Sequence, residues 1–146
     1  DKIKEMANVA EKIIVENFDD SEFVCRDIAE TLGISEVYLR LIFKNEYGTS
    51  PGQYMLKVRM SEAWDLLADG ISVSEVAGRV GYCDIFRFSK AFKKYYGYSS
   101  KNVKMNSVKM QSINQVLSLS KSKLLLSKEQ NSVRKIYLKV QSSLQK

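Results

Sequence analysis

Histidine is absent from this chain of 146 residues. Its absence removes the side chain that serves most often as a general base and as a metal ligand. The sequence also contains no paired carboxylates, no phosphate-binding glycine loop and no nucleophile–base pair in a recognisable pattern. The two cysteines, Cys25 and Cys83, match no metal or redox spacing and are expected to be reduced thiols. We therefore expect a protein that is not an enzyme and that needs no metal or cofactor.

Long apolar segments are also missing. No run of about 18 apolar residues occurs, so the sequence predicts no membrane span, and it shows no signal peptide. With one proline, seven glycines and 45% apolar residues, the composition is typical of a helical globular protein with a packed core. We expect an all-α fold and a cytoplasmic location.

The positive charge is concentrated near the C-terminal end. The net charge of the chain is +6, but residues 102–146 alone hold nine Lys and Arg against one Glu, a net charge of +8. Residues 1–101 therefore have 14 Lys and Arg against 16 Asp and Glu, a net charge of −2. Evidence for nucleic-acid binding by residues 1–101 must come from local charge.

Two segments of the chain share one pattern of apolar residues and glycines. A shift of 48 residues places Ile28, Ala29, Leu32 and Gly33 on Val76, Ala77, Val80 and Gly81, and a shift of 49 places Leu39, Phe43 and Gly48 on Phe88, Phe92 and Gly97. A two-copy repeat with matched apolar spacing indicates a duplicated supersecondary unit.

Each copy is expected to form two helices joined by a short turn. Gly33 and Gly81 end the first helix of each copy, and Ser35 and Asp84 cap the second. The expected helices span residues 25–32 and about 36–47, then about 73–80 and 85–96. This is the helix-turn-helix pattern. The core face of the last helix is expected to hold Phe88, Ala91, Phe92 and Tyr95.

A single helix of about 16 residues is expected between the copies, over about 52–68. Its apolar stripe would contain Tyr54, Val58, Trp64 and Leu67. An amphipathic helix is also expected at the start of the chain. Seven helices would then fill residues 2–101, with the central helix as a linker between two similar lobes.

The outer face of the second helix in each copy carries the candidate binding residues. Those residues are Val37, Arg40, Leu41 and Lys44 in the first copy, and Ile85, Phe86, Arg87, Lys90, Lys93 and Lys94 in the second. The major groove of B-DNA admits one α-helix and recurs every ~34 Å along one face of the duplex. Two such helices on a stiff linker can enter consecutive grooves. An ordinary solvated helix face is the alternative, above all in the first copy, where Glu36 and Glu46 offset the basic residues.

Segments 34–51 and 81–99 resemble the signature of AraC/XylS-type transcription regulators, and the resemblance covers about residues 3–101. It implies a seven-helix, double helix-turn-helix domain with one lobe at about 2–50, a linker helix at about 52–68 and a second lobe at about 71–101. The implied function is sequence-specific binding of double-stranded DNA by a transcription regulator.

The resemblance also assigns roles to individual residues. It implies that Val37, Arg40, Leu41, Ile85, Phe86, Arg87 and Lys90 read bases. Arginine and lysine would hydrogen-bond to bases, and the apolar side chains would contact thymine methyl groups. Phosphate contacts are expected from Ser35, Lys44, Lys93 and Lys94. Leu41 and Lys90 stand where the family often has arginine, which leaves the base preference open.

Double-stranded DNA is the implied partner, and RNA polymerase is a candidate second one. The resemblance also implies a ligand-sensing or phosphorylation-sensing domain outside this chain, as part of a longer regulator. The alternative function is a helical protein-interaction module that has lost specific DNA binding, which the net charge of −2 on residues 1–101 favours.

Residues 102–146 lie outside the resemblance and form a basic extension rich in serine and lysine. Five apolar residues keep helical spacing and predict a basic amphipathic helix near 131–145: Val133, Ile136, Tyr137, Val140 and Leu144. Three interpretations stay open. The extension is solvated and partly helical or disordered, or it packs on the domain or on another copy, or it contacts DNA or a membrane surface.

Overall fold

The computed structural model describes residues 1–103, which form six α-helices, one 3-10 turn and no strand. The elements are α1 (Lys2–Asn17), α2 (Cys25–Leu32), α3 (Glu36–Tyr47), α4 (Pro51–Ala68), α5 (Val73–Arg79), α6 (Ile85–Tyr96) and the 3-10 turn η1 (Ser100–Asn102). The all-α prediction is confirmed, but these residues form six α-helices where seven were predicted, and η1 is a single 3-10 turn. Within residues 1–103, no helix has the length and apolar character to cross a membrane. The helix predicted near 131–145 lies outside the described residues.

Capping residues set the ends of α3 and α6. Ser35 Oγ accepts a backbone N–H of α3 at 3.1 Å, and Asp84 Oδ1 accepts one of α6 at 2.8 Å. Each bond satisfies a donor that has no partner inside the helix. Both helices end at a glycine with positive φ, 76° at Gly48 and 83° at Gly97. The predicted bounds of α3 and α6 are therefore observed.

Two other helix starts depend on less obvious caps. Ser50 caps α4, which begins at Pro51 because proline suits the first turn of a helix. Val24, at the start of α2, has no side-chain acceptor. Instead, the Asp27 carboxylate accepts the backbone N–H of Val24 at 2.9 Å, so the cap is made from inside the helix.

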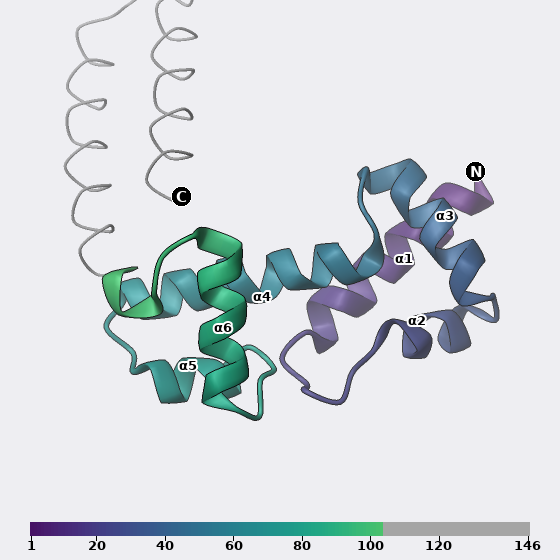
Figure 1. Ribbon diagram of the computed structural model, residues 1–146. Helices are drawn as coiled ribbons and strands as arrows, with labels where there is room; N and C mark the ends of the chain where they lie inside the picture. Colours follow the sequence, from purple (N-terminus) through teal and green to yellow (C-terminus); the bar gives the residue numbers. More distant parts are fainter. Residues whose placement is uncertain (104–146) are drawn as a thin grey trace, which may run out of the picture.

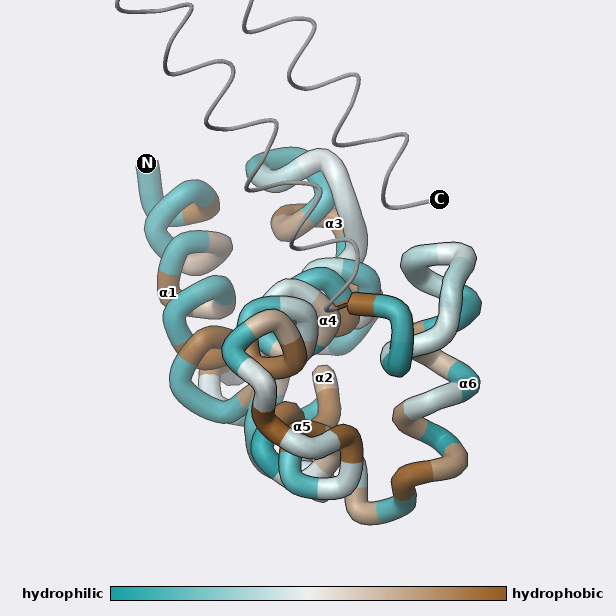
Figure 2. Tube along the Cα trace, turned by 90° about the vertical axis from the view of Figure 1, so that its left-hand side faces the viewer, coloured by the Kyte–Doolittle hydropathy of each residue, from teal (hydrophilic) through white to brown (hydrophobic). Residues whose placement is uncertain are grey.

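Two hydrophobic cores lie at the two ends of α4 (Figure 1). We call residues 1–50 lobe 1 and residues 71–103 lobe 2. The buried residues of the first core are Ala10, Ile14, Phe23, Ile28, Ala29, Leu39 and Phe43. Those of the second are Met60, Ala63, Leu67, Val76, Ala77, Val80, Phe88, Phe92, Tyr96 and Val103. Figure 2 looks nearly along α4 and shows α1 and α6 on opposite sides of it.

The second core differs from the prediction at three positions, Tyr95 and Tyr96 on α6 and Met60 on α4. Tyr95 was expected to face inward, but it is 41% exposed, whereas Tyr96 is 6% exposed. The i, i+4 row that begins with Phe88 and Phe92 continues to Tyr96, so Tyr96 takes the inner place. Its hydroxyl donates to the Met60 carbonyl oxygen on α4 at 2.9 Å. Met60 is fully buried although it lies outside the predicted stripe of α4.

Candidate nucleic-acid interface

The outer face of α3 combines apolar and basic side chains. Val37 is 68% exposed and Leu41 is 66% exposed, while Arg40 and Lys44 are also exposed. The opposite face is buried because Leu39 and its neighbours form the core of lobe 1. Burial of exposed apolar side chains of this size against a partner is favourable, because it removes their surface from water. The residues predicted to face outward on α3 therefore share one open surface.

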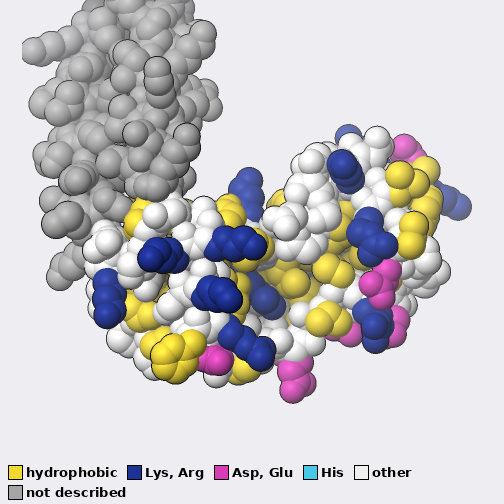
Figure 3. All heavy atoms as spheres, viewed as in Figure 1, with side chains coloured by type: hydrophobic (Ala, Val, Ile, Leu, Met, Phe, Trp, Pro, Cys, Tyr) yellow, Lys and Arg dark blue, Asp and Glu magenta, His cyan; other side chains and the backbone are white. Residues whose placement is uncertain are grey.

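The outer face of α6 is more basic. Phe86 is 80% exposed and Ile85 is 39% exposed. The exposed basic residues are Arg87, Lys90, Lys93 and Lys94. Figure 3 shows Lys and Arg side chains gathered over lobe 2, on the left of the view. Within residues 1–103 these four side chains form no ion pair, so their charges face solvent.

Acidic residues accompany the basic ones in lobe 1. Arg26 pairs with Glu36, with 3.3 Å between nitrogen and oxygen, and Lys4 pairs with Glu46 at 3.9 Å. Both glutamates belong to α3, the helix that carries Arg40. The α3 surface consequently attracts a polyanion less than the α6 surface does.

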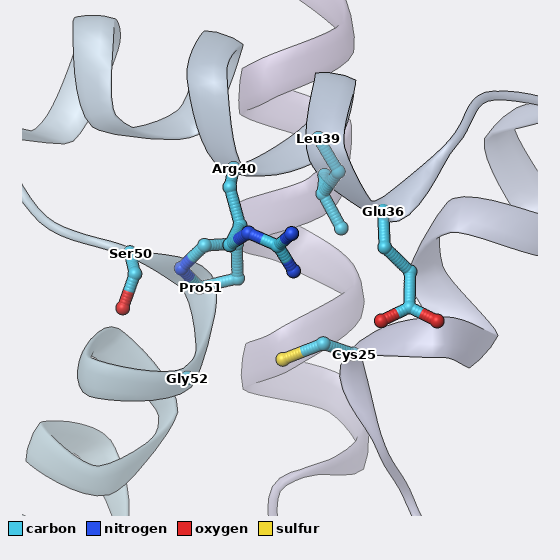
Figure 4. Close-up of a pocket in the computed structure, with 7 residues that line it drawn as sticks. All are labelled: Cys25, Glu36, Leu39, Arg40, Ser50, Pro51 and Gly52. Carbon is cyan, nitrogen blue, oxygen red and sulfur yellow. The ribbon is translucent and has the colours of Figure 1, made fainter.

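Arg40 lies at a pocket of about 220 Å³ between α2, α3 and the start of α4. Figure 4 shows its guanidinium between Pro51 and Leu39, toward the Cys25 thiol. Burial raises the pKa of the Cys25 thiol and the Glu36 carboxylate raises it further, whereas Arg40 opposes the shift. The thiol is therefore neutral at pH 7, as expected for a reduced cysteine without nucleophilic character.

The two caps give the N-termini of α3 and α6 different charges. Ser35 Oγ accepts the Tyr38 N–H, and its own hydroxyl proton stays available for a phosphate oxygen. Asp84 places a carboxylate at the start of α6, which disfavours a phosphate there. Lys93 and Lys94 lie in the last turn of α6, where the helix dipole favours cations. Lys44 likewise lies in the last turn of α3, so the helices differ only at their N-termini, where Ser35 suits a phosphate and Asp84 does not.

In the sequence, Arg59 fits the linker helix of the family that the chain resembles, but no contact was predicted for it. It is half-buried on α4 between the lobes. The only hint in the sequence was a charged residue between the apolar positions of a predicted helix, which indicates that its charge has a partner. Its contacts depend on the tertiary structure, because its two hydrogen-bond acceptors are backbone carbonyl oxygens of lobe 1.

Two helix-turn-helix units at the ends of one connecting helix, each with an open second helix, define a double helix-turn-helix DNA-binding domain. A family model described as a helix-turn-helix domain matches residues 28–105. The chain is 39% identical over 97 residues to the Msm operon regulatory protein of Streptococcus mutans, spanning 66% of this chain and 34% of that protein. It is 37% identical over 99 residues to the raffinose operon transcriptional regulatory protein RafR of Pediococcus pentosaceus, spanning 67% and 35%.

A solved structure agrees with these relatives. The C-terminal domain of AraT, a response regulator from Geobacillus stearothermophilus, matches with a TM-score of 0.66 and 35% identity, over 68% of this chain and 84% of that domain. The chain belongs to the AraC-type helix-turn-helix family of transcription regulators, which confirms the resemblance seen in the sequence. It spans about a third of the length of the curated relatives named above.

Proposed function

We propose that residues 1–101 bind a specific duplex DNA site by placing α3 and α6 in two successive major grooves. The observation that carries this proposal is the open outer face of both helices, one at each end of the 18-residue helix α4. Helix α4 is roughly 27 Å long at about 1.5 Å per residue. That length is of the same order as the ~34 Å repeat of the major groove.

The two helices would recognise bases through different sets of contacts. On α6, Arg87 would bind guanine through two hydrogen bonds, Lys90 would contact a base, and Ile85 and Phe86 would pack against thymine methyl groups. On α3, Arg40 would be the hydrogen-bonding reader, with Val37 and Leu41 as apolar readers. Lysines 44, 93 and 94 and the Ser35 hydroxyl would hold phosphates and fix the register of the protein on the duplex.

The names of the relatives extend the proposal to the whole protein. Two are regulators of operons, and one solved neighbour is a domain of a response regulator. We infer that the complete protein is a cytoplasmic transcription regulator without enzymatic activity, with RNA polymerase as a second partner. A sensor or receiver domain would lie outside this chain, and residues 102–146 would be an extension beyond the DNA-binding domain.

Selection of binding sites from a random duplex pool, followed by titration of variants, tests the DNA-binding proposal. Arg87→Ala is expected to cost about 1–3 kcal/mol on the selected site and to relax the preference at one position. Lys12→Ala removes an exposed positive charge from α1 and serves as the control, with little effect on specificity. An equal loss on all sequences would assign Arg87 to the DNA backbone.

A salt titration separates the proposal from the alternative function. Binding through several phosphates must weaken steeply as salt concentration rises. If no sequence emerges from the selection and the residual binding is insensitive to salt, the chain would be a helical protein-interaction module instead.

A further inference from the structure

Arg59 contacts both lobes from its position on α4. Its Nε donates to the Phe18 carbonyl oxygen at 2.8 Å, and Nη2 donates to the Asp20 carbonyl oxygen at 3.2 Å. Both acceptors belong to lobe 1. The guanidinium carbon lies 5.6 Å from the centre of the Tyr82 ring, which belongs to the turn before α6 in lobe 2. One side chain therefore connects the two lobes across their shared helix.

Gly81 brings the backbones of the two lobes together at the same point. A Cβ atom at Gly81 would collide with the Phe18 carbonyl oxygen and would lie 3.1 Å and 3.2 Å from Arg59 Nε and Nη2. The residue is buried, and its φ of 89° is a conformation that glycine adopts readily. The turn between α5 and α6 thus packs directly against the end of α1.

The chemistry of this contact suits arginine in particular. Phe18 is the C-cap of α1, whose last turn contains no basic residue, so the partial negative charge of that helix end has no cation of its own. Arg59 supplies one from another helix. Its guanidinium donates to two carbonyl oxygens while its carbon lies over the Tyr82 ring, a combination that the compact ammonium of lysine does not offer.

We propose that Phe18, Asp20, Arg59, Gly81 and Tyr82, which we call the inter-lobe contact, hold α3 and α6 at a fixed separation and orientation. This inference rests on the proposed function, because that separation would set the spacing of the two half-sites in the DNA. Arg59 is a positioning residue and touches no base. Without it, the lobes would be held by α4 and by the packing of Gly81 against Phe18 alone, and each would have more freedom to move about its own end of α4.

Fixed geometry has a consequence for affinity. Once one recognition helix is bound, the other meets its half-site at an effective concentration set by the stiffness of the connection. A more flexible connection between the lobes lowers that effective concentration when the half-sites have the correct spacing. It also allows the protein to bind half-sites at other spacings with less loss. The inter-lobe contact therefore affects two-site binding and leaves the binding of a single half-site unchanged.

The first experiment measures the geometry without DNA. Spin labels are placed on the native Cys83 of lobe 2 and on Glu30→Cys of lobe 1, in the full chain with Cys25→Ser. We expect a narrow distribution of label distances, and a broader one after Arg59→Met. The control is Lys57→Met, which changes an exposed residue of the same helix and should leave the distribution narrow. A distribution that stays narrow with Arg59→Met would overturn the inference.

Milder variants cover the case in which Arg59→Met fails to fold. Tyr82→Leu retains both hydrogen bonds of Arg59 and removes the aromatic ring, so we expect a partial broadening. Arg59→Lys retains the charge without the planar group and is expected to give a broad distribution. If neither variant broadens the distribution while both proteins keep their helical content, the inter-lobe contact does not fix the lobes.

The second experiment uses three duplexes built from the selected site: the complete site, the site with one base pair inserted between the half-sites, and the α6 half-site alone. We expect Arg59→Met to lose roughly tenfold on the complete site. Its affinity for the half-site should equal that of the native protein, and the inserted base pair should reduce its affinity less than it reduces that of the native protein. Equal losses on the complete site and the half-site would show a general loss of folded protein and would overturn the inference.

The two experiments can reject the proposed function and the inter-lobe contact independently. If no specific site is selected, the proposed function is wrong, while the label distances still decide whether the inter-lobe contact exists. If specific binding is found and the label distances do not respond to Arg59, the inter-lobe contact is wrong and the proposed function stands.

Discussion

Lobe 1 and lobe 2 share one architecture and carry opposite charge. Lobe 1 has six Lys and Arg against eleven Asp and Glu, a net charge of −5, whereas lobe 2 has six against two, a net charge of +4. The buried residues correspond in both lobes, with Leu39 and Phe43 of α3 in the places of Phe88 and Phe92 of α6. The core pattern fixes the shape of each lobe, and the outer surface is free to differ because it takes no part in packing.

The charge difference suggests that the two lobes contribute different interactions to DNA binding. Lobe 2 attracts the phosphate backbone over the Debye length of about 8 Å at physiological salt. Lobe 1 is repelled over the same range, and its exposed Val37 and Leu41 act only on contact. We infer that lobe 2 supplies most of the electrostatic affinity and that lobe 1 contributes mainly by close fit.

The largest predicted effect tests whether the two cores are equivalent. Phe43→Ala and Phe92→Ala each remove a fully buried ring. Each is expected to lower the free energy of unfolding by about 3–5 kcal/mol, because a cavity adds to the lost burial. Chemical denaturation measures the loss. A much smaller effect of one substitution would mean that its core is less tightly packed and that the lobes are not structural equivalents.

The second prediction concerns the unequal charge of the lobes. Lys93→Ala with Lys94→Ala should reduce the slope of log affinity against log salt by about 2, if each lysine holds one phosphate as proposed. Lys44→Ala on α3 is the matched change in lobe 1 and should reduce the slope by about 1 or less. Titrations at several salt concentrations give both slopes. If Lys44→Ala changed the slope more than the double substitution on α6 does, lobe 1 rather than lobe 2 would supply most of the electrostatic affinity.

The third prediction compares how α4 is attached to each lobe. The Tyr54 hydroxyl on α4 donates to Glu11 in lobe 1 at 2.9 Å, and the Tyr96 hydroxyl in lobe 2 donates to α4. Burial, and then the hydrogen bond to Glu11, raise the pKa of Tyr54 to about 12. Burial raises the pKa of Tyr96 as well.

Because the folded pKa values lie above the unfolded value of about 10, the native protein holds these protons more tightly. The resulting stabilisation is complete below pH about 10 and is lost as the pH rises toward 12. Denaturation at increasing pH should show the decline, with less of it in Tyr54→Phe. At pH 7 that substitution should cost about 1 kcal/mol for the lost hydrogen bond. A stability that stays constant up to pH 12 would contradict this account.

The smallest predicted effect tests the apolar readout by α3. Replacing thymine by uracil in the lobe 1 half-site removes a methyl group and should cost about 0.8 kcal/mol for each methyl that Val37 or Leu41 covers. Titration of Leu41→Ala against both duplexes checks the assignment, because the cost should shrink in that variant. If uracil has no effect anywhere in the half-site, α3 does not read thymine methyl groups.

Local signals predicted most of the fold. Ser35 and Asp84 cap helices and Gly48 and Gly97 end them through interactions within a few residues, so their effects are visible in the sequence. The exposure of the candidate readers also followed from helical periodicity. The i, i+4 row of Phe88 and Phe92 also indicates Tyr96 as the inner residue, so the prediction of Tyr95 missed a local signal. The hydrogen bond from Tyr96 to the Met60 carbonyl oxygen depends on the tertiary structure.

The inter-lobe contact could not be predicted from the sequence. The acceptors of Arg59 lie 41 and 39 residues away along the chain. Both are backbone carbonyl oxygens, which every residue possesses, so no side-chain pattern indicates them. The position of Arg40 at the pocket beside Cys25 likewise depends on how α4 begins next to α3.

A hydroxyl-radical footprint on the selected duplex tests most directly whether one chain fills two grooves. The account predicts two protected segments on one face of the DNA, about 10 base pairs apart. Arg40→Ala should weaken the protection of one segment and Arg87→Ala that of the other. A single protected segment, or the same segment weakened by both variants, would contradict it.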